Sequence, residues 1–175
     1  MTTAYLLLGT NMGDRECHLE RARDLLSGDR GGREGVFPPP GRLVVEKRSH
    51  VYETAAWGKI EQDDYLNQVV SLSTTLSAQE LLKFTSGIET IMGRVRKKVW
   101  EPRIIDLDIL FYGDQIIREE RLVIPHPHLQ DRRFALTPLA EIAPDLVHPV
   151  FGITVRELLK QCPDPLGVRQ YAVEN

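Results

Sequence analysis

Residues 102–112, with the sequence PRIIDLDILFY, constrain the fold of this chain more than any other stretch. Every second position from Arg103 onward forms an almost unbroken apolar row, made of Ile105, Leu107, Ile109 and Phe111. The positions between them include Asp106 and Asp108. Because side chains of a β-strand alternate between two faces, this period predicts a half-buried strand. A strand rises about 3.3 Å per residue, so the two carboxylates project from one face, roughly 7 Å apart.

This acidic pair suits hard divalent cations, since Mg²⁺ usually binds one or two carboxylates together with phosphate oxygens and water. A strand whose solvated face is merely acidic gives the same pattern. The preceding segment favours the metal, because residues 93–103 carry five basic residues and one acidic residue. Arg and Lys bind phosphate oxygens directly, and a metal bridges phosphates to carboxylates. A charged run alone is more often a solvated loop, but the two adjoining signals together predict a nucleotide–metal site.

Length and composition favour one globular domain that spans residues 1–175. The chain has 175 residues, of which 42% are hydrophobic and 27% charged, which suits one core better than two. The net charge of −3 argues against a general nucleic-acid or membrane partner. Cys17 and Cys162 match no metal or redox spacing, so we expect free thiols. The sequence shows no leader-like start and no long apolar run, and we expect a cytoplasmic protein.

The order of the predicted elements indicates an α+β fold. The pattern predicts a strand (4–8), a helix (14–27), two strands (43–52 and 65–75), a helix (77–92) and the strand with the aspartates (102–112). Capping signals support both helices, at Asp14 and at the capping box Ser77–Glu80. This βαββαβ order is the ferredoxin-like pattern, an antiparallel sheet with its helices on one face. The Gly- and Pro-rich stretch near 28–42 is predicted as an irregular loop insertion.

Beyond this unit the sequence predicts a C-terminal hairpin and a helical extension. Gly113-Asp114 is typical of a hairpin turn that leads into residues 115–117. Residues 124–128, IPHPH, form a proline-rich loop, and residues 139–143 are predicted as a short helix before Pro144. A capping box at Thr154 predicts a last helix.

The side chains give no support for covalent catalysis. No Ser or Cys lies in a recognisable nucleophile motif, and the sequence has no P-loop. His126 and His128 with an aspartate offer zinc ligands, although His-x-His in a proline-rich loop is more often structural or a phosphate donor. Trp57, Tyr65 and Phe134 are core residues by default. Two of them on the sheet face of the aspartates would sandwich a flat heterocycle.

A series of short motifs also runs through most of the chain. They are Gly9-Thr10-Asn11, Tyr52-x-Thr54 with Trp57-Gly58, Asp64-Tyr65-Leu66-Asn67, Arg94-x-Arg96, Trp100-x-Pro102-Arg103-x-x-Asp106-x-Asp108-Ile109, Pro125-His126, Arg132-x-Phe134 and Glu141-Ile142-Ala143-Pro144. This set, in this order, resembles the 6-hydroxymethyl-7,8-dihydropterin pyrophosphokinase family. The resemblance implies transfer of pyrophosphate from ATP to the hydroxymethyl group of a reduced pterin, with release of AMP, in folate synthesis. It implies the same ferredoxin-like fold.

The resemblance also implies roles for individual residues. Asp106 and Asp108 would hold two Mg²⁺ ions against the phosphates of ATP, the co-substrate, while Arg94 and Arg103 would neutralise charge during transfer. The residues implied to contact ATP are Glu89, Arg96, Trp100, Ile109, Arg121, His126 and Arg132. Those implied to contact the pterin are Thr54, Ala55, Trp57, Tyr65, Asn67 and Phe134, with Tyr65 and Phe134 stacking on its ring.

The sequence departs from the family's pattern at three positions. Val99 and Glu101 stand where the family often has a cation and usually has Gly, and Ala56 stands where Pro is expected. Glu101 adds a negative charge near phosphates, and Ala56 loosens the pterin loop. The acidic pair and the cations are intact, so we expect activity.

Two other functions stay open at this point. The first is another Mg-dependent phosphoryl or nucleotidyl transferase with a different acceptor, because fold alone does not fix the substrate. The second is an RNA-binding module, since ferredoxin-like sheets carry RNA on surface aromatics, although a carboxylate pair on that face would repel phosphates. For the pyrophosphokinase we expect small-molecule substrates, no nucleic-acid or membrane partner, and a monomer.

Overall fold

The computed structural model describes residues 1–28, 41–55, 63–93 and 104–172. Its main sheet is built from β1 (Thr2–Thr10), β2 (Leu43–Arg48), β3 (Tyr52–Thr54), β4 (Tyr65–Thr74), β5 (Asp106–Tyr112) and β8 (Val168–Gln170). A separate pair of strands is β6 (Ile117–Glu119) with β7 (Leu122–Ile124). The helices are α1 (Arg15–Ser27), α2 (Ala78–Ile91), α3 (Arg133–Ile142) and α4 (Val155–Gln161), with a 3₁₀ turn at Leu129–Asp131.

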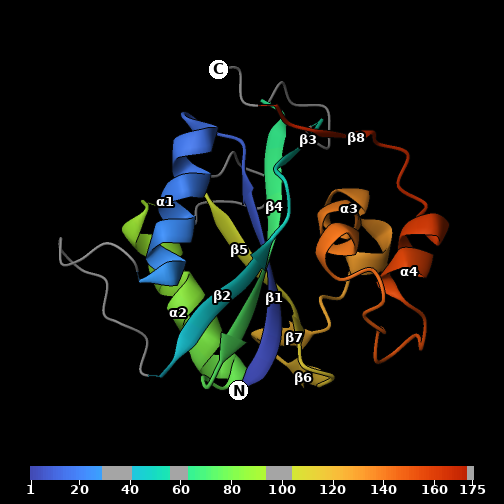
Figure 1. Cartoon of the computed structure of the whole chain (residues 1–175). Helices are drawn as coiled ribbons and strands as arrows, with labels where there is room; N and C mark the ends of the chain where they lie inside the picture. The colour runs from blue at the N-terminus through green and yellow to red at the C-terminus, as the bar shows by residue number, and fades with distance from the viewer. Residues whose placement is uncertain (29–40, 56–62, 94–103, 173–175) are drawn as a thin grey trace.

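The sheet has the strand order β5-β1-β4-β3-β8, and β2 also pairs with β4. Each described pairing is antiparallel, and α1 and α2 lie on one face of the sheet (Figure 1). The predicted ferredoxin-like order is therefore confirmed. The predicted helical extension is confirmed too, and α3 and α4 lie on the opposite side of the sheet from α1 and α2.

One predicted strand, residues 43–52, is wrong in its continuity, because the chain forms β2 and β3 with a break at residues 49–51. At the break the hydroxyl of Ser49 accepts a hydrogen bond from the Val69 N–H at 3.0 Å. The Gln68 amide donates to the Ser49 carbonyl at 2.7 Å, so side chains replace part of the regular ladder. Thr54, which lies beyond the predicted strand, ends β3.

The predicted ends of α1 and α2 are confirmed by their caps. Asp14 accepts a hydrogen bond from the Cys17 N–H, and Gly28 ends α1 with a positive φ of 66°. Ser77 and Glu80 form the expected capping box at the start of α2. None of the helices in the described ranges is long and apolar enough to cross a bilayer.

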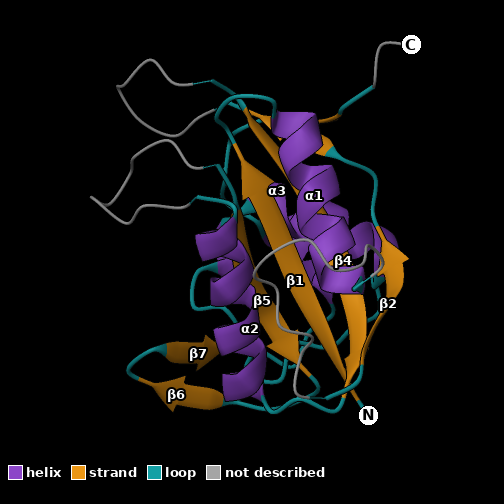
Figure 2. Cartoon of the chain, turned by 90° about the vertical axis from the view of Figure 1, so that its left-hand side faces the viewer, coloured by secondary structure: helices purple, strands orange, loops and turns teal. Residues whose placement is uncertain are grey.

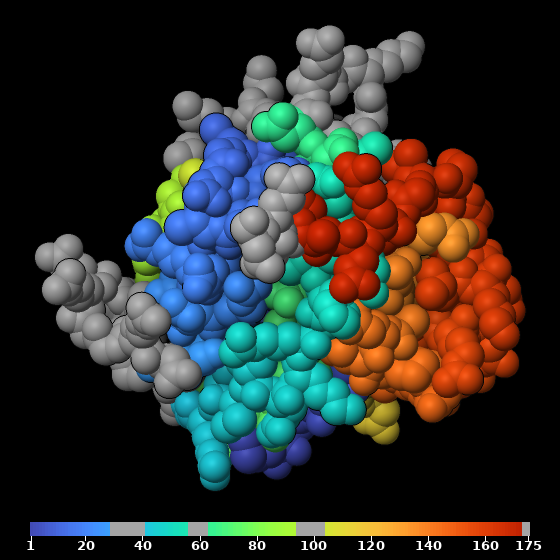
Figure 3. All heavy atoms as spheres, turned by 45° about the horizontal axis from the view of Figure 1, so that its top comes forward, coloured from blue at the N-terminus to red at the C-terminus, as the bar shows by residue number. Residues whose placement is uncertain are grey.

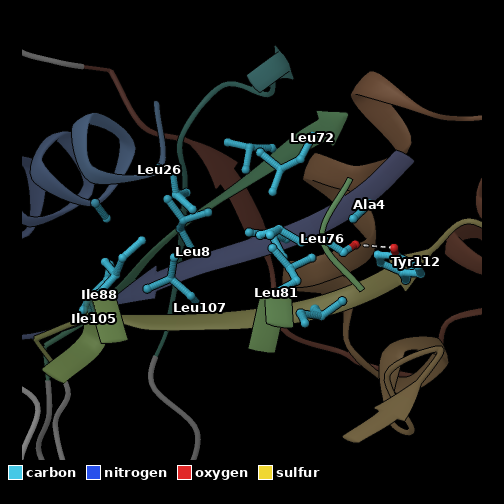
Figure 4. Close-up of a cluster of buried hydrophobic side chains, with 14 of the residues drawn as sticks. Ala4, Leu8, Leu26, Leu72, Leu76, Leu81, Ile88, Ile105, Leu107 and Tyr112 are labelled. Carbon is cyan, nitrogen blue, oxygen red and sulfur yellow. Dashed lines mark hydrogen bonds between the residues drawn. The ribbon is translucent and has the colours of Figure 1, made fainter. Parts of the chain in front are cut away.

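Apolar side chains fill both sides of the sheet. Leu6 and Leu8 of β1 pack with residues of α1 and α2, as Figure 4 shows around Leu8. Leu7 points to the other side, where it belongs to a cluster with Val69 and Leu136. This alternation along one strand separates the face covered by α1 and α2 from the face that carries α3 and α4.

A β-bulge corrects the predicted alternation of residues 102–112. Leu6 pairs with Ile109 and Tyr5 with Phe111, so Leu110 is an extra residue in β5. The predicted apolar row holds as far as Ile109, but Phe111 joins the cluster on the α3 side. Tyr112 turns to the α1–α2 side instead, where its hydroxyl donates to the Leu76 carbonyl (Figure 4).

The C-terminal extension differs from the prediction in two places. Gly113 does form a turn, with a φ of 55°, but the following residues do not pair with β5. The hairpin is instead β6 with β7, which lies apart from the main sheet (Figure 2). The predicted helix at 139–143 begins earlier, at Arg133, and contains Pro138. A proline within a helix lacks one backbone donor and so suggests a break in the sequence pattern.

Two further local predictions are confirmed, whereas most of the loop insertion predicted near 28–42 lies outside the described residues, and Ile124 of the predicted loop 124–128 ends β7. Thr154 and Glu157 form the capping box that starts α4. Cys17 and Cys162 are both free, the first exposed and the second buried.

Candidate functional site

Asp106 and Asp108 begin β5 on the face of the sheet that does not touch α1 and α2. In the ladder with β1, Asp106 pairs with Gly9 and Asp108 with Leu7. Side chains of directly paired residues share a face, and Leu7 belongs to the cluster on the α3 side. Both aspartates are half-buried. The sheet thus presents two carboxylates together, as the alternation predicted.

A row of residues crosses the sheet from this acidic pair. Asp106 pairs with Gly9, Gly9 with Asn67, and Asn67 with Tyr52. A Cβ atom at Gly9 would lie 3.1 Å from the Asn67 Oδ1, which is closer than ordinary contact. Glycine at this position therefore leaves the face open between the carboxylate and the amide.

Polar groups from β3 and β4 lie at the far end of this row. The Asn67 amide donates to the Thr54 hydroxyl at 3.1 Å, and both residues are buried. Tyr65 pairs with Thr54 and is two residues from Asn67, so its side chain shares their face. Ala55 is exposed and directly follows β3. Thr54, Tyr65 and Asn67 are thus brought together, as the resemblance implies.

His126 approaches the same face through the bulge of β5. Its backbone N–H donates to the carbonyl of Leu110, the extra residue of the bulge, at 3.0 Å. Its Nδ1 lies 3.3 Å from the backbone N–H of His128 and accepts from it. Its Nε2 lies 3.5 Å from the Arg132 Nη1. Burial, assisted by the charges of Arg132 and His128, lowers the pKa of His126 to about 4.

Both ring nitrogens of His126 face donors. A neutral imidazole has one acceptor nitrogen and one donor. The His128 N–H points at Nδ1 and the Arg132 guanidinium, which can only donate, points at Nε2, so a neutral ring accepts only one of the two hydrogen bonds. Arg132 is a donor in either tautomer of His126, and an anion would accept from it.

Phe134 and Arg132 lie at the start of α3. The Arg132 guanidinium carbon is 5.8 Å from the centroid of the Phe134 ring, a cation–π distance. Phe134 is half-buried and packs against the cluster on the α3 side of the sheet. Arg121 lies in the turn between β6 and β7 and is exposed.

Two of the residues implied to contact ATP lie on the other side of β5. The Ile109 side chain is 6% exposed and belongs to the α1–α2 core, so only its backbone is accessible to a nucleotide. Glu89 of α2 is 4% exposed, and its Oε1 accepts a hydrogen bond from the Leu107 N–H at 2.8 Å. Leu107 stands between the two aspartates, so Glu89 fixes the backbone that carries them.

Other sequence predictions fall outside the described residues. Those implied to bind ATP, to neutralise charge or to line the pterin are Trp57, Arg94, Arg96, Trp100 and Arg103; those that depart from the family's pattern are Ala56, Val99 and Glu101. The zinc alternative gains no support, since the described ranges contain no cluster of three or more metal-ligating side chains.

The comparison with protein families decides which family the chain belongs to. The model of the family described as 7,8-dihydro-6-hydroxymethylpterin-pyrophosphokinase (HPPK) matches residues 5–144. The chain belongs to the HPPK family. Within that family it transfers pyrophosphate from ATP to 6-hydroxymethyl-7,8-dihydropterin, with release of AMP, in folate biosynthesis.

Individual relatives agree with this membership. The chain is 44% identical to the 2-amino-4-hydroxy-6-hydroxymethyldihydropteridine pyrophosphokinase of Methylorubrum extorquens, over 97% of this chain and 99% of the relative. It is 40% identical to the enzyme of the same name from Aquifex aeolicus, over 90% of both chains. A crystal structure of Plasmodium falciparum HPPK-DHPS shares the fold, with a TM-score of 0.69 and 19% identity over 92% of this chain. This chain spans 43% of that longer protein.

The sequence patterns assigned no role to several residues that hold the elements around this candidate site. Glu141 of α3 accepts hydrogen bonds from the His50 N–H and, at 3.0 Å, from the Tyr52 hydroxyl. Burial and this bond raise the pKa of Tyr52 to about 12. The Arg15 guanidinium bonds both the Glu53 carboxylate and the Asp64 carbonyl. Such partners lie tens of residues apart, and no local pattern connects them.

Proposed function

We propose that pyrophosphate transfer takes place on the sheet face that carries Asp106 and Asp108. ATP would lie against this acidic pair, and the pterin against Thr54, Tyr65 and Asn67. The observation that carries the proposal is the continuous row from Asp106 through Gly9 to Asn67, because it joins a cation-binding group to a polar acceptor site across neighbouring strands.

The residues present fit Mg²⁺. Asp106 and Asp108 supply hard carboxylate oxygens from one face, and Gly9 beside Asp106 adds no side chain. Among the described residues no third acidic, His or Cys side chain completes a cluster, which suits an ion that takes phosphate oxygens and water as its other ligands. We assign two Mg²⁺ ions to this pair. When bound, they supply positive charge against the phosphates.

His126 and Arg132 are the described residues best placed to hold the phosphates. Their side-chain nitrogens lie side by side, Arg132 is a donor in either tautomer of His126, and burial keeps the His126 ring neutral by lowering its pKa to about 4. Arg121 would reach the nucleotide from the β6–β7 turn. We assign the remaining contacts with ATP and its transferred group to Arg94, Arg96, Trp100 and Arg103 of the basic segment. Multiple guanidiniums stabilise charge on phosphate oxygens and need no covalent step.

The acceptor site uses both polar and aromatic groups. The Thr54 hydroxyl and the Asn67 amide are joined to each other, so both are held in fixed orientations for the polar edge of a pterin. Tyr65 and Phe134 supply rings for stacking on its faces, and Ala55 and Trp57 follow Thr54 along the chain. The site thereby places the acceptor hydroxyl beside the phosphates, which is the alignment that transfer requires.

We also propose that the chain forms one domain, works in the cytoplasm and acts as a monomer. The two apolar clusters share one sheet, which favours a single folding unit. Both cysteines are free, as in proteins of reducing compartments. Size-exclusion chromatography at assay concentrations tests the oligomeric state.

The proposal is tested by Asp108→Asn, which keeps the size of the side chain but removes its charge. We expect turnover, measured as AMP release with ATP, Mg²⁺ and the hydroxymethyl pterin, to fall on the order of a hundredfold or more. The thermal midpoint should change little, because Asp108 is half-buried and not part of a core. Asp145→Asn is the matched control, since its side chain is 81% exposed on the far side of α3. Normal turnover of Asp108→Asn would refute the assignment.

A further inference from the structure

The segment formed by residues 162–170 lies beyond residues 5–144, the part of the chain that the family model matches. It leaves α4, passes α3 and ends in β8 beside β3 (Figure 1). In the space-filling view its red atoms adjoin the teal atoms of residues 41–55 on one side and orange atoms of the α3–α4 region on the other (Figure 3). This segment therefore touches both elements that contribute to the acceptor site.

Its first contact is with the start of α3. The Asp164 carboxylate accepts a hydrogen bond from the Arg133 N–H at 3.1 Å, and Asp164 is 3% exposed. In return the Arg133 guanidinium donates to the backbone carbonyls of Asp164 and Cys162, at 3.0 and 2.9 Å. Arg132, the N-cap residue of α3, provides no side-chain cap of its own. Asp164 thus caps the helix from a distant part of the chain.

This cap acts next to a residue of the proposed acceptor site. Arg133 is flanked by Arg132 and Phe134, whose side chains lie within cation–π distance of each other. The Arg133 guanidinium donates two hydrogen bonds to backbone carbonyls of the segment, and the Arg133 N–H donates a third to the Asp164 carboxylate. These bonds hold the first turn of α3, which carries Phe134.

The second contact is with β3. In the ladder between β8 and β3, Val168 pairs with Thr54 and Arg169 with Glu53. The Arg169 Nε donates to the Glu53 Oε2 at 2.9 Å. The other oxygen of Glu53 accepts from Arg15 at 3.0 Å, and the same Arg15 nitrogen donates to the Asp64 carbonyl at 2.6 Å. Thr54 follows Glu53 and Tyr65 follows Asp64, so this cluster holds both.

The charges of this second contact are favourably arranged. The Glu53 side chain is 10% exposed and lies between two guanidiniums, of which Arg15 is 23% and Arg169 74% exposed. Burial raises the pKa of Glu53, but the hydrogen bonds from Arg169 and Arg15 outweigh it and leave the pKa below its ordinary value. Glu53 is thus ionised at neutral pH and paired on both sides.

We propose that residues 162–170 are a positioning element that sets the separation between Phe134 on α3 and Thr54 with Tyr65 on β3 and β4, and through it the affinity for the flat acceptor. The proposal rests on the acceptor site assigned above. Stacking on two rings depends on their spacing, so a displacement of about 1 Å at either wall weakens binding. ATP is assigned to β5, His126 and Arg132, so its affinity should not respond to the β3 contact and should respond less than pterin affinity to the α3 contact.

The test uses two conservative substitutions, one at each contact. Asp164→Asn keeps the shape of the cap but removes its charge, and Arg169→Met keeps the length of the side chain but removes its hydrogen bonds. The probe is 6-hydroxymethylpterin, and its dissociation constant is measured by fluorescence with a saturating non-hydrolysable ATP analogue and Mg²⁺. We expect it to rise about three- to tenfold in each variant, as loss of a cap or a charged hydrogen bond would produce.

Three comparisons make the outcome specific. The dissociation constant of the ATP analogue should stay unchanged in Arg169→Met, whose contact lies on β3, and should rise less than that of the pterin in Asp164→Asn, because Arg132 adjoins Arg133. Arg169→Lys, which keeps a charge opposite Glu53, should restore part of the pterin affinity. Arg156→Met removes an exposed ion pair of α4 with Asp145. It is the matched control and should leave the dissociation constants of both ligands unchanged.

The possible results separate this inference from the function on which it rests. If pterin affinity is unchanged in Asp164→Asn and Arg169→Met, or if affinity for both ligands falls equally and together with thermal stability, the segment has only a structural role and the inference is overturned. Thr54→Val and Phe134→Ala test the acceptor site itself. Normal pterin affinity in these two would overturn the proposed site, whereas weakened affinity in them alone would overturn only the positioning role.

Discussion

His126 is held neutral at physiological pH by its surroundings. Burial is the largest cause, and the positive charge of Arg132 adds to it, so its pKa falls to about 4. An ordinary His near phosphates would change charge around pH 6.5. The ring instead stays neutral, and the cation beside it supplies the charge. The Nε2 atom of His126 and the Nη1 atom of Arg132 lie 3.5 Å apart, so both side chains face the same place.

This shift predicts a dependence of stability on pH. Between about pH 6.5 and about 4 the unfolded chain binds a proton at His126 and the folded protein does not, so the free energy of unfolding falls as the pH falls through this range. Above pH 6.5 both states are neutral and the contribution vanishes. His126→Gln should flatten this part of the profile, measured by urea unfolding at a series of pH values. Burial also lowers the pKa of His148, so part of the slope should remain. An identical profile in the variant would contradict the assignment.

At the same scale, the sequence predicted the acidic pair but not what holds it. Asp106 and Asp108 stand out because a period of two is a local property of the chain. Glu89 was expected near the nucleotide, yet it binds the Leu107 N–H from inside the protein. Only the packing of α2 against β5, elements that are separated by the basic segment in sequence, reveals this role.

Among the elements, β1 lies between the strand of the acidic pair, β5, and the strand of Asn67, β4. Gly9 of β1 separates Asp106 of β5 from Asn67 of β4, and any side chain there would approach the Asn67 Oδ1 to 3.1 Å. Glycine suits position 9 because a side chain there would be too close to Asn67, and not because the backbone has an unusual conformation.

Gly9→Ala should therefore displace the Asn67 amide by a few tenths of an ångström. We expect a loss of about 1 kcal/mol in the free energy of unfolding from overpacking, and a weaker pterin affinity through the disturbed bond to Thr54. Denaturant unfolding and pterin titration measure the two effects. Gly87→Ala is the control, because nothing lies within 4 Å of a Cβ atom at that helical position. Unchanged pterin affinity in Gly9→Ala would show that Asn67 is not part of the acceptor site.

The elements also show where prediction from sequence succeeds. Both capping boxes and the end of α1 at Gly28 are confirmed because caps are encoded within a few residues. The bulge in β5 could not be predicted, since it depends on the pairing with β1. The start of α3 was missed because Pro138 suggests a break and because its cap, Asp164, lies 31 residues after Arg133.

In the whole molecule, the two faces of the sheet carry different groups. The face covered by α1 and α2 is an apolar core, and the other face has a second apolar cluster together with the acidic pair, the proposed acceptor residues and α3. Glu141 and Asp164 hold α3 at its two ends, to the β2–β3 break and to the C-terminal segment. The elements around the proposed site are therefore held by partners from distant parts of the chain. The βαββαβ order was predictable from hydrophobic periods, whereas this assembly was not.

The central claim is that nucleotide-bound cations lie on the acidic pair of β5, and paramagnetic broadening tests it most directly. With Mn²⁺ in place of Mg²⁺ and with the ATP analogue bound, the amide NMR signals of Gly9, Leu107 and Asp108 should broaden most, and those of α4 should stay sharp. Asp108→Asn should reduce the effect at the same metal concentration. Broadening centred on another part of the protein, or an unchanged pattern in Asp108→Asn, would contradict the account.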